Sequence, residues 1–232
     1  AKGMSNAVAV LAVSPRGSMY DPSAVFYMQK LVTGPEAAEV VDIRYPVAEN
    51  IHQVAKAKGS APEDVTVMVL DRPRHQDMVD EIRATGARIK FLVDGDVAGA
   101  IMAARRGTGI DLLLGIGGTP EGIIAACAMK CLDGVIQARL WPKDDEESQR
   151  AIDAGHDLER VLYTNDLVNS DDVFFVATGI TDGELMQGVR YRGGGASTHS
   201  LVMRSRSGTI RSITSEHKLR KLKSYAAVDF EH

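Results

Sequence analysis

The sequence predicts an α/β protein, and two features of its pattern carry this prediction. Between residues 65 and 133, three strand-like apolar runs alternate with helical stretches, which is typical of parallel strands joined by crossover helices. Residues 190–214 alternate polar and apolar side chains on either side of a turn at 206–208, which favours an antiparallel hairpin. The chain has 232 residues, of which 44% are hydrophobic and 25% charged, so it is long enough to bury a sizeable core.

Three segments precede the alternating region. Residues 7–13 are all Ala, Val or Leu, and such a run predicts a strand that is buried on both faces. Residues 24–31 form a mixed apolar segment that carries Tyr27. After a stretch in which strand-like and helical signals mix, residues 47–56 favour a helix.

The alternating region consists of three strand–helix units. The predicted strands comprise residues 65–70, 88–93 and 111–114, and the helices that follow them comprise residues 77–85, 97–105 and 119–133. The segments between strand and helix read DRPRH at 71–75, DGD at 94–96 and GIGGTPEG at 115–122. Because ligands of open α/β sheets bind beyond the carboxyl ends of the strands, we expect these three segments to form one site.

The glycines at 115–118 predict a turn in which a ligand can approach the backbone closely. Thr119 suits the cap of the next helix and Pro120 its first turn, so free N–H groups there would face a bound anion. The segment matches neither common phosphate-loop motif, and the alternative is a turn that only connects two elements. Glu121 then either complements the helix dipole or reaches across to a cation.

The remaining signals are weaker. Expected elements are a strand at 137–141, a charged helix at 144–155 and short strands at 161–163 and 173–177. We interpret Cys127 and Cys131 as reduced, buried thiols rather than as metal ligands or a disulfide, which indicates a reducing compartment, the cytoplasm. The net charge of −4 argues against a nucleic-acid partner, and no apolar run is long enough to span a membrane.

Each strand-end segment offers its own chemistry. Arg72 and Arg74 suit a phosphate, because two guanidinium groups supply paired N–H donors, but two surface salt bridges explain them equally well. Asp94 and Asp96 can accept hydrogen bonds from sugar hydroxyls, bind a divalent cation or cap the following helix. His75 is either a base or a structural residue. Together these groups point to a phosphorylated, polyhydroxylated ligand.

These motifs also carry a family resemblance. The segments RPRH, DGD and GIGGTPEG, the segment YMQKLVTGP around Tyr27, and ATGITDG at 177–183 together resemble the class II fructose-1,6-bisphosphatases of the GlpX type. These enzymes belong to the lithium-sensitive, metal-dependent phosphatases. The resemblance runs through essentially the whole chain. It implies a layered α/β/α/β/α sandwich and the removal of the 1-phosphate of fructose 1,6-bisphosphate with Mg²⁺ or Mn²⁺, in gluconeogenesis.

The resemblance also implies roles for individual residues. Glu121 is the expected metal ligand, and no catalytic residue is assigned. The residues expected to contact the sugar bisphosphate are Tyr27, Arg72, Pro73, Arg74, Asp94, Gly95, Asp96 and Gly118. The family's other metal carboxylates lie in an upstream Glu-rich stretch and a DPxEGT motif, and neither occurs in this sequence. We therefore expect residues 1–232 to be the C-terminal two thirds of such an enzyme, with the sugar-phosphate-binding region at about 65–135.

Two alternatives stay open beside a fructose-1,6-bisphosphatase. One is a dual enzyme that also accepts sedoheptulose 1,7-bisphosphate. The other is a non-catalytic sugar-phosphate-binding fragment, which the chain would be without the upstream metal motifs. In each case the expected partner is a sugar phosphate rather than a nucleic acid or a membrane, and we expect a homo-oligomer.

Overall fold

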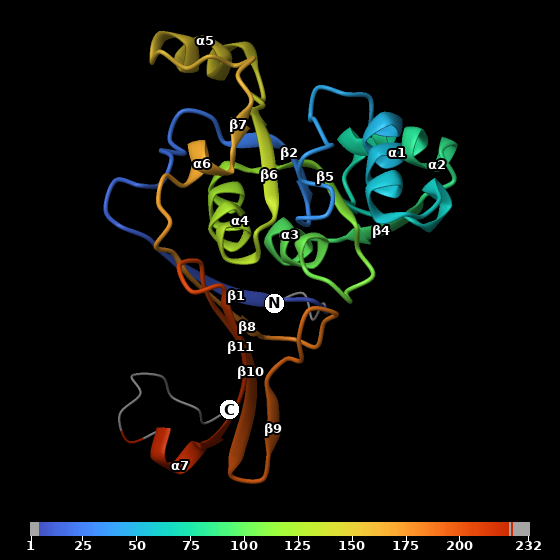
Figure 1. Cartoon of the computed structure of the whole chain (residues 1–232). Helices are drawn as coiled ribbons and strands as arrows, with labels where there is room; N and C mark the ends of the chain where they lie inside the picture. Colours follow the sequence, from blue (N-terminus) through green and yellow to red (C-terminus); the bar gives the residue numbers. More distant parts are fainter. Residues whose placement is uncertain (1–4, 223, 225–232) are drawn as a thin grey trace.

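The computed structural model describes residues 5–222 and residue 224, and its strands form two sheets (Figure 1). One sheet has the strand order β4-β3-β5-β2-β6-β7, and the other has the order β1-β8-β10-β11 with β9 paired to β10. The strands are β1 Val8–Val13, β2 Tyr27–Thr33, β3 Thr66–Leu70, β4 Arg88–Leu92, β5 Leu112–Gly118, β6 Val135–Leu140, β7 Leu162–Tyr163, β8 Phe174–Gly179, β9 Arg190–Arg192, β10 Gly195–Arg204 and β11 Thr209–Lys218.

The helices form two layers with these sheets. Figure 1 shows α3 and α4 between the sheets, and α1 and α2 against the opposite face of the six-stranded sheet. The α-helices are α1 Val47–Lys58, α2 Gln76–Ala84, α3 Asp96–Ala104, α4 Thr119–Leu132, α5 Asp145–Asp153, α6 Thr164–Leu167 and α7 Leu219–Leu222, and short 3₁₀ helices lie at Pro62–Asp64 and Pro73–His75. The predicted α/β class is confirmed, and the described elements form four layers in the order α/β/α/β. Within the part of the chain that the structure describes, no helix is long and apolar enough to cross a membrane.

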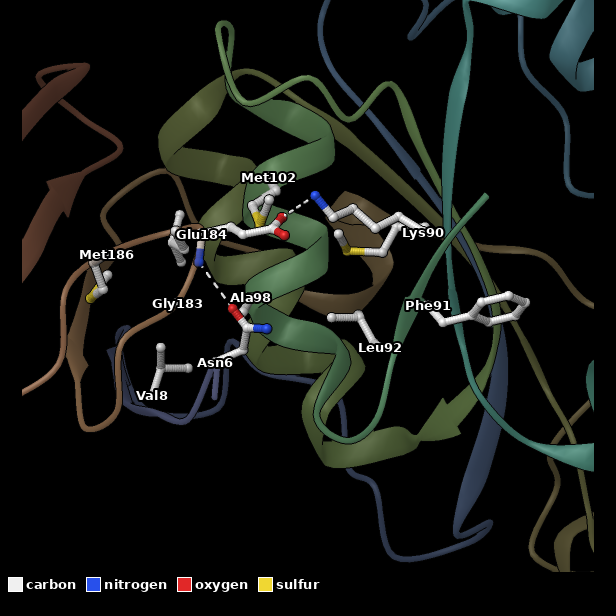
Figure 2. A pocket seen from close by; sticks show the side chains of 12 residues that line it. Asn6, Val8, Lys90, Phe91, Leu92, Ala98, Met102, Gly183, Glu184 and Met186 are labelled. Atoms are coloured by element: carbon white, nitrogen blue, oxygen red, sulfur yellow. Dashed lines mark hydrogen bonds and ion pairs between the residues drawn. The ribbon is translucent and has the colours of Figure 1, made fainter. Parts of the chain in front are cut away.

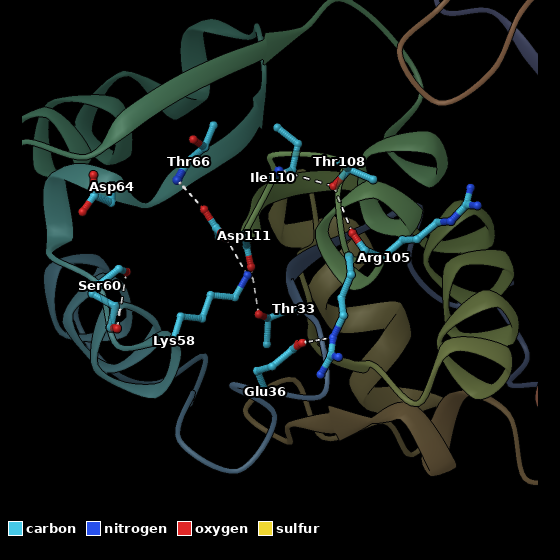
Figure 3. Close-up of polar contacts among 12 residues, drawn as sticks. Thr33, Glu36, Lys58, Ser60, Asp64, Thr66, Arg105, Thr108, Ile110 and Asp111 are labelled. Carbon is cyan, nitrogen blue, oxygen red and sulfur yellow. Dashed lines mark hydrogen bonds and ion pairs between the residues drawn. The ribbon is translucent and has the colours of Figure 1, made fainter.

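The three strand–helix units are confirmed. β3 pairs in parallel with both β4 and β5, so all three strands end at the same edge of the sheet. Where β3 and β5 begin, Asp111 connects the start of β3 to the end of α1 and to the last residue of β2, as Figure 3 shows. Its carboxylate accepts a hydrogen bond from the N–H of Thr66 at 2.8 Å and pairs with Lys58, while its carbonyl accepts from the hydroxyl of Thr33 at 2.8 Å.

A second set of contacts joins the edge of the six-stranded sheet to the segment after β8. Figure 2 shows Lys90 on β4 paired with Glu184, whose N–H donates to Asn6. The two distances are 2.6 and 2.9 Å. A small cavity of about 20 Å³ lies beside this ion pair, and its lining is largely apolar, with the side chains of Met102 and Met186. Its polar lining residues, Asn6, Lys90 and Glu184, contact one another through Glu184.

The expectation of a fully buried strand at 7–13 is wrong. β1 is an edge strand that pairs with β8, and its residues alternate between partly buried and exposed. Leu11 is 60% exposed and Val13 is 51% exposed. The run is apolar on both faces, but in the described structure only one face packs against the core.

The segment at 24–31 is more regular than its sequence indicates. β2 is an inner strand of the six-stranded sheet and runs antiparallel to both β5 and β6. The sheet is therefore mixed rather than parallel throughout. Because β2 runs against β5, its first residue, Tyr27, lies opposite Gly118 at the edge where β3, β4 and β5 end.

Candidate functional site

The polar segments after β3, β4 and β5 surround one cavity of about 220 Å³. Its lining residues are Phe26, Tyr27, Leu70, Arg72, Arg74, Asp94, Gly95, Asp96, Gly117, Gly118 and Glu121. The structure thus brings together every site residue expected from the sequence except Pro73, which does not line the cavity. Pro73 is the first residue of the 3₁₀ helix that carries Arg74, so it constrains the backbone conformation of the segment without lining the cavity.

Arg72 links the ends of β3 and β4. Its guanidinium donates to the carbonyl oxygens of Asp71 and Val93, at 2.8 and 2.7 Å, and pairs with Asp94 at 3.1 Å. The side chain of Asp94 is 85% exposed. Because an exposed ion pair contributes only about 0–1 kcal/mol, a phosphate can replace Asp94 on Arg72 at little cost.

Arg74 faces the aromatic side of the cavity. It donates to the carbonyl of Ile116 at 2.8 Å, and its guanidinium lies 5.0 Å from the centroid of the Tyr27 ring. Tyr27 in turn makes edge contacts with Phe26 and Trp141, with ring centroids 4.7 and 6.2 Å apart. The guanidinium is therefore held over an aromatic face, with most of its N–H donors left for a ligand.

A buried lysine that is not among the predicted site residues lies behind the cavity. Lys30 of β2 is 2% exposed, and its ammonium donates to Asp96 Oδ2 at 2.6 Å and to the carbonyl of Gly118 at 2.7 Å. Asp96 begins α3 and is itself buried. The sequence offers one signal, a lysine inside an otherwise largely apolar strand. Lysine is almost never buried unless it is paired, so its presence there indicates a buried partner of opposite charge.

The expectation of a turn at 115–118 is wrong, because these glycines are the last residues of β5 and pair with β2. Their missing side chains make room for carboxylates. A Cβ atom on Gly117 would stand 2.2 Å from Asp96 Oδ2, and one on Gly118 would stand 1.9 Å from Glu121 Oε2. In the structure, these glycines accommodate the side chains of the site.

The start of α4 also differs from the expectation. Gly118 occupies the cap position, and the hydroxyl of Thr119 donates to the carbonyl of Val25 at 2.7 Å instead of capping the helix. Pro120 stands in the first turn as predicted. The helix ends at Leu132, followed by Asp133 in the left-handed conformation, one residue before the predicted glycine.

His75 takes the structural role of the two left open for it. It is 1% exposed, and both ring nitrogens contact backbone groups, of Leu70 and of Ile116. Burial lowers the pKa of the imidazole, and the charges of Arg74 and Arg72 lower it further. A buried ring with both nitrogens engaged is not placed to accept a proton from a ligand in the cavity.

Glu121 is the carboxylate best placed to bind a cation. It stands exposed in the first turn of α4, at the wall of the cavity, and within the described residues no hydrogen bond or ion pair occupies it. Mg²⁺ is commonly held by one or two carboxylates together with waters and substrate phosphates. Residues 5–222 and 224 contain no group of three or more His, Cys, Asp or Glu side chains placed to hold a metal. Glu121 therefore fits as one ligand of an incomplete set.

Comparison with known proteins identifies the family. The family model described as bacterial fructose-1,6-bisphosphatase, glpX-encoded, matches residues 1–217. The chain belongs to this family. The resemblance drawn from the motifs is thereby confirmed.

Individual relatives of this bisphosphatase family agree. A protein of Synechococcus sp. (strain JA-3-3Ab), named D-fructose 1,6-bisphosphatase class 2/sedoheptulose 1,7-bisphosphatase, is 40% identical over 230 residues, which are 94% of this chain and 66% of that protein. The fructose-1,6-bisphosphatase class 2 of Haemophilus influenzae is 38% identical over 232 residues, with 94% and 69% covered. The chain thus spans about two thirds of the length of the relatives that it matches.

Proposed function

We propose that this chain carries the substrate site of a metal-dependent fructose-1,6-bisphosphatase, which hydrolyses the 1-phosphate to yield fructose 6-phosphate and phosphate in gluconeogenesis. The observation that carries the proposal is the single cavity lined by two arginines, two aspartates and an exposed glutamate. A sugar bisphosphate requires these three kinds of group, namely donors for phosphate, acceptors for hydroxyls and a carboxylate for a metal ion. The names of the relatives support the same reaction.

In this proposal the two arginines hold the phosphate that does not react. Arg74 is fixed over the Tyr27 ring, and Arg72 exchanges the exposed Asp94 for the phosphate. Binding energy from the remote phosphate then orients the sugar, so that part of it appears in turnover. Asp96 accepts a hydrogen bond from a furanose hydroxyl, and a sugar that leaves this acceptor unpaired binds poorly.

Glu121 is the proposed ligand of Mg²⁺ or Mn²⁺ on this chain. A bound metal ion supplies charge neutralisation of the phosphoryl oxygens and activation of water. The residues around Glu121 serve its placement: Gly118 leaves space for the carboxylate, and Pro120 fixes the first turn of α4. Further oxygen ligands are required, and the described residues do not supply them.

A second candidate is a dual enzyme that also hydrolyses sedoheptulose 1,7-bisphosphate. Two of the relatives carry both activities in their names. The longer sugar presents the same terminal phosphates and a similar set of hydroxyls, so the same arginines and aspartates serve both substrates. Turnover of the two bisphosphates under identical conditions separates the candidates.

The deciding experiment is phosphate release by the purified protein from fructose 1,6-bisphosphate, with Mg²⁺, with Mn²⁺ and with excess chelator. Metal-dependent release supports the proposal. Saturable binding of fructose 6-phosphate without any release identifies a sugar-phosphate-binding fragment instead. A protein that neither binds nor hydrolyses sugar phosphates contradicts both.

We also propose that the protein acts in the cytoplasm as a homo-oligomer. The two free, buried cysteines of the described structure support a reducing compartment. Light scattering on the purified protein measures the oligomeric state directly.

A further inference from the structure

Lys30 and Asp96 form a buried ion pair, and buried ion pairs add little to the stability of a protein core. Both side chains are almost fully buried, at 2% and 6% exposure. Removing two charges from water costs several kcal/mol, and well-packed apolar residues are often as stable or more stable in the same space. Stability alone therefore does not explain the pair. One of its two members, Asp96, lines the proposed sugar-phosphate cavity, which suggests a use there.

The chain leaves space for the lysine at two glycines. A Cβ atom on Gly117 would stand 3.1 Å from Lys30 Nζ, and one on Gly122 would stand 3.1 Å from Lys30 Cε. The ammonium lies between the end of β5 and the first turn of α4, where it binds Asp96 and the carbonyl of Gly118. The lysine is therefore held in one place between two elements that form the site.

One oxygen of Asp96 has no partner. Lys30 binds Oδ2, whereas Oδ1 is buried and makes no hydrogen bond within the described part of the chain. Leaving such an acceptor unsatisfied costs about 1–3 kcal/mol, so the free oxygen calls for an explanation. Because Asp96 lines the cavity, a hydroxyl of a bound sugar is the donor that its position favours.

We propose that Lys30 is a positioning residue for the sugar. By holding Oδ2, it fixes the Asp96 carboxylate so that Oδ1 accepts a hydrogen bond from a sugar hydroxyl. By holding the carbonyl of Gly118, it also fixes the start of the helix that carries Glu121. This inference rests on the proposed function and extends it, because it assigns selectivity for a hydroxylated phosphate ester over inorganic phosphate to a residue that does not line the cavity.

The test compares two probes on the purified protein, fructose 6-phosphate and inorganic phosphate, by calorimetry. In Lys30→Met, we expect the affinity for fructose 6-phosphate to fall by about tenfold or more, which is about 1.4 kcal/mol. Phosphate binding to the arginines should change by less than about twofold, or about 0.4 kcal/mol. The matched control is Lys90→Met, which removes an ion pair of the same 2.6 Å length that is about 42% exposed. Neither Lys90 nor its partner Glu184 lines the proposed sugar-phosphate cavity. The control should change neither affinity.

Kinetics add a second measure. In Lys30→Met, KM for fructose 1,6-bisphosphate should rise by a larger factor than kcat falls, because the acceptor for the sugar is displaced while the arginines are intact. If Lys30→Met does not fold, the double variant Lys30→Met with Asp96→Asn, which removes both buried charges, is compared with Asp96→Asn alone. Because Lys30 acts through Asp96, these two proteins should bind fructose 6-phosphate equally weakly, and a further loss in the double variant would contradict the inference.

The outcomes separate the inference from the proposed function. A wild-type protein with no affinity for fructose 6-phosphate overturns both. If the wild-type protein binds the sugar phosphate, the inference alone is overturned by a Lys30→Met variant with unchanged affinity, or by one that loses both probes equally. Failure of both variants to fold also overturns it, because the ion pair then serves the fold.

Discussion

The Nε2 atom of His75 accepts a hydrogen bond from the backbone N–H of Ile116 at 2.9 Å. Since Nε2 accepts, the ring proton is on Nδ1, which donates to the carbonyl of Leu70 at 2.7 Å. The carbonyl of the same Ile116 accepts from Arg74. Arg74 and His75 thus bind both backbone polar groups of one residue in β5, and this fixes the guanidinium of Arg74 against the neighbouring strand.

This arrangement predicts a loss of stability in acid. A protonated imidazole cannot accept from Ile116, and burial lowers the pKa of His75 below its ordinary value of 6.5. The unfolded chain therefore binds the proton more readily, so the contribution of His75 is complete above pH 6.5 and is lost as the pH falls towards its folded-state pKa. We expect the free energy of unfolding in urea to fall below pH 6.5, and to fall less in His75→Gln.

The control is the replacement of the exposed His52 by Gln, which should leave the slope of the unfolding free energy against pH unchanged. Equal slopes in all three proteins would contradict the prediction.

Arg74→Ala should weaken substrate binding more than it slows bond cleavage. The loss of a paired guanidinium from a phosphate site should raise KM for fructose 1,6-bisphosphate by about tenfold or more. Lysine should recover little of this, because an ammonium cannot reproduce the planar fork. Arg83→Ala removes an exposed arginine of α2 that pairs with Asp80, and it should leave KM unchanged. A KM that stays the same in Arg74→Ala returns the segment to the surface-salt-bridge interpretation.

Arg72→Ala should differ from Arg74→Ala in its effect on stability. Arg72 makes hydrogen bonds to the carbonyls of Asp71 and Val93, so its loss should loosen the ends of β3 and β4 as well as the proposed phosphate site. We expect a similar rise in KM and, in addition, a lower melting temperature by calorimetry. If Arg72→Ala melts at the same temperature as the wild-type protein, the backbone contacts of Arg72 contribute nothing measurable.

Glu121→Gln should abolish most phosphatase activity and leave the fold intact. The exchange keeps the shape of the side chain but removes the charge that a metal ligand needs. Phosphate release at ordinary metal concentrations is the measurement, with circular dichroism as the check on folding. Glu81→Gln on the exposed face of α2 is the matched control. Near-normal turnover in Glu121→Gln would favour a helix-dipole role for this carboxylate.

The strand–helix units could be predicted closely because their signals are local. Each of the strands β3, β4 and β5 contains a short apolar run bounded by charged residues or glycine. The rule that ligands bind beyond the carboxyl ends of such strands then located the cavity. Neither step required knowledge of which distant segments meet.

The features that could not be predicted from the sequence depend on contacts between distant segments of the chain. Lys30 can be buried because it forms an ion pair with Asp96, which is 66 residues away in the sequence. No sequence signal near Lys30 identifies this partner. The glycines at 115–118 form strand because β2 pairs with them, although glycine disfavours strands on its own. Whether both faces of β1 are buried depends on what packs against its sheet, which an apolar run does not reveal.

The two cysteines should resist alkylation in the folded protein. Burial raises the pKa of Cys127 to about 11 and that of Cys131 to about 12, so neither is a thiolate at neutral pH. Mass spectrometry after treatment with iodoacetamide should show no added mass in native buffer and two additions in concentrated urea. Labelling of either thiol under native conditions would show that the helix α4 opens.

Gly99→Ala should destabilise the layer between the two sheets. Gly99 lies in α3, and a Cβ atom there would stand 2.7 Å from Leu92 Cδ1 and from Met68 Sδ, and 2.8 Å from Leu113 Cδ1. Overpacking a core costs about 1–3 kcal/mol, and three contacts under 3 Å place this substitution in the upper part of that range, at about 2–3 kcal/mol. The better helix propensity of Ala offsets up to about 1 kcal/mol, so we expect a net loss of about 1–2 kcal/mol. For a chain of this size that lowers the melting temperature by about 2–8 °C.

The control is Gly193→Ala, where a Cβ atom meets nothing within 4 Å, and its melting temperature should not change. A Gly99→Ala protein as stable as the wild type would mean that the three neighbouring side chains repack without cost.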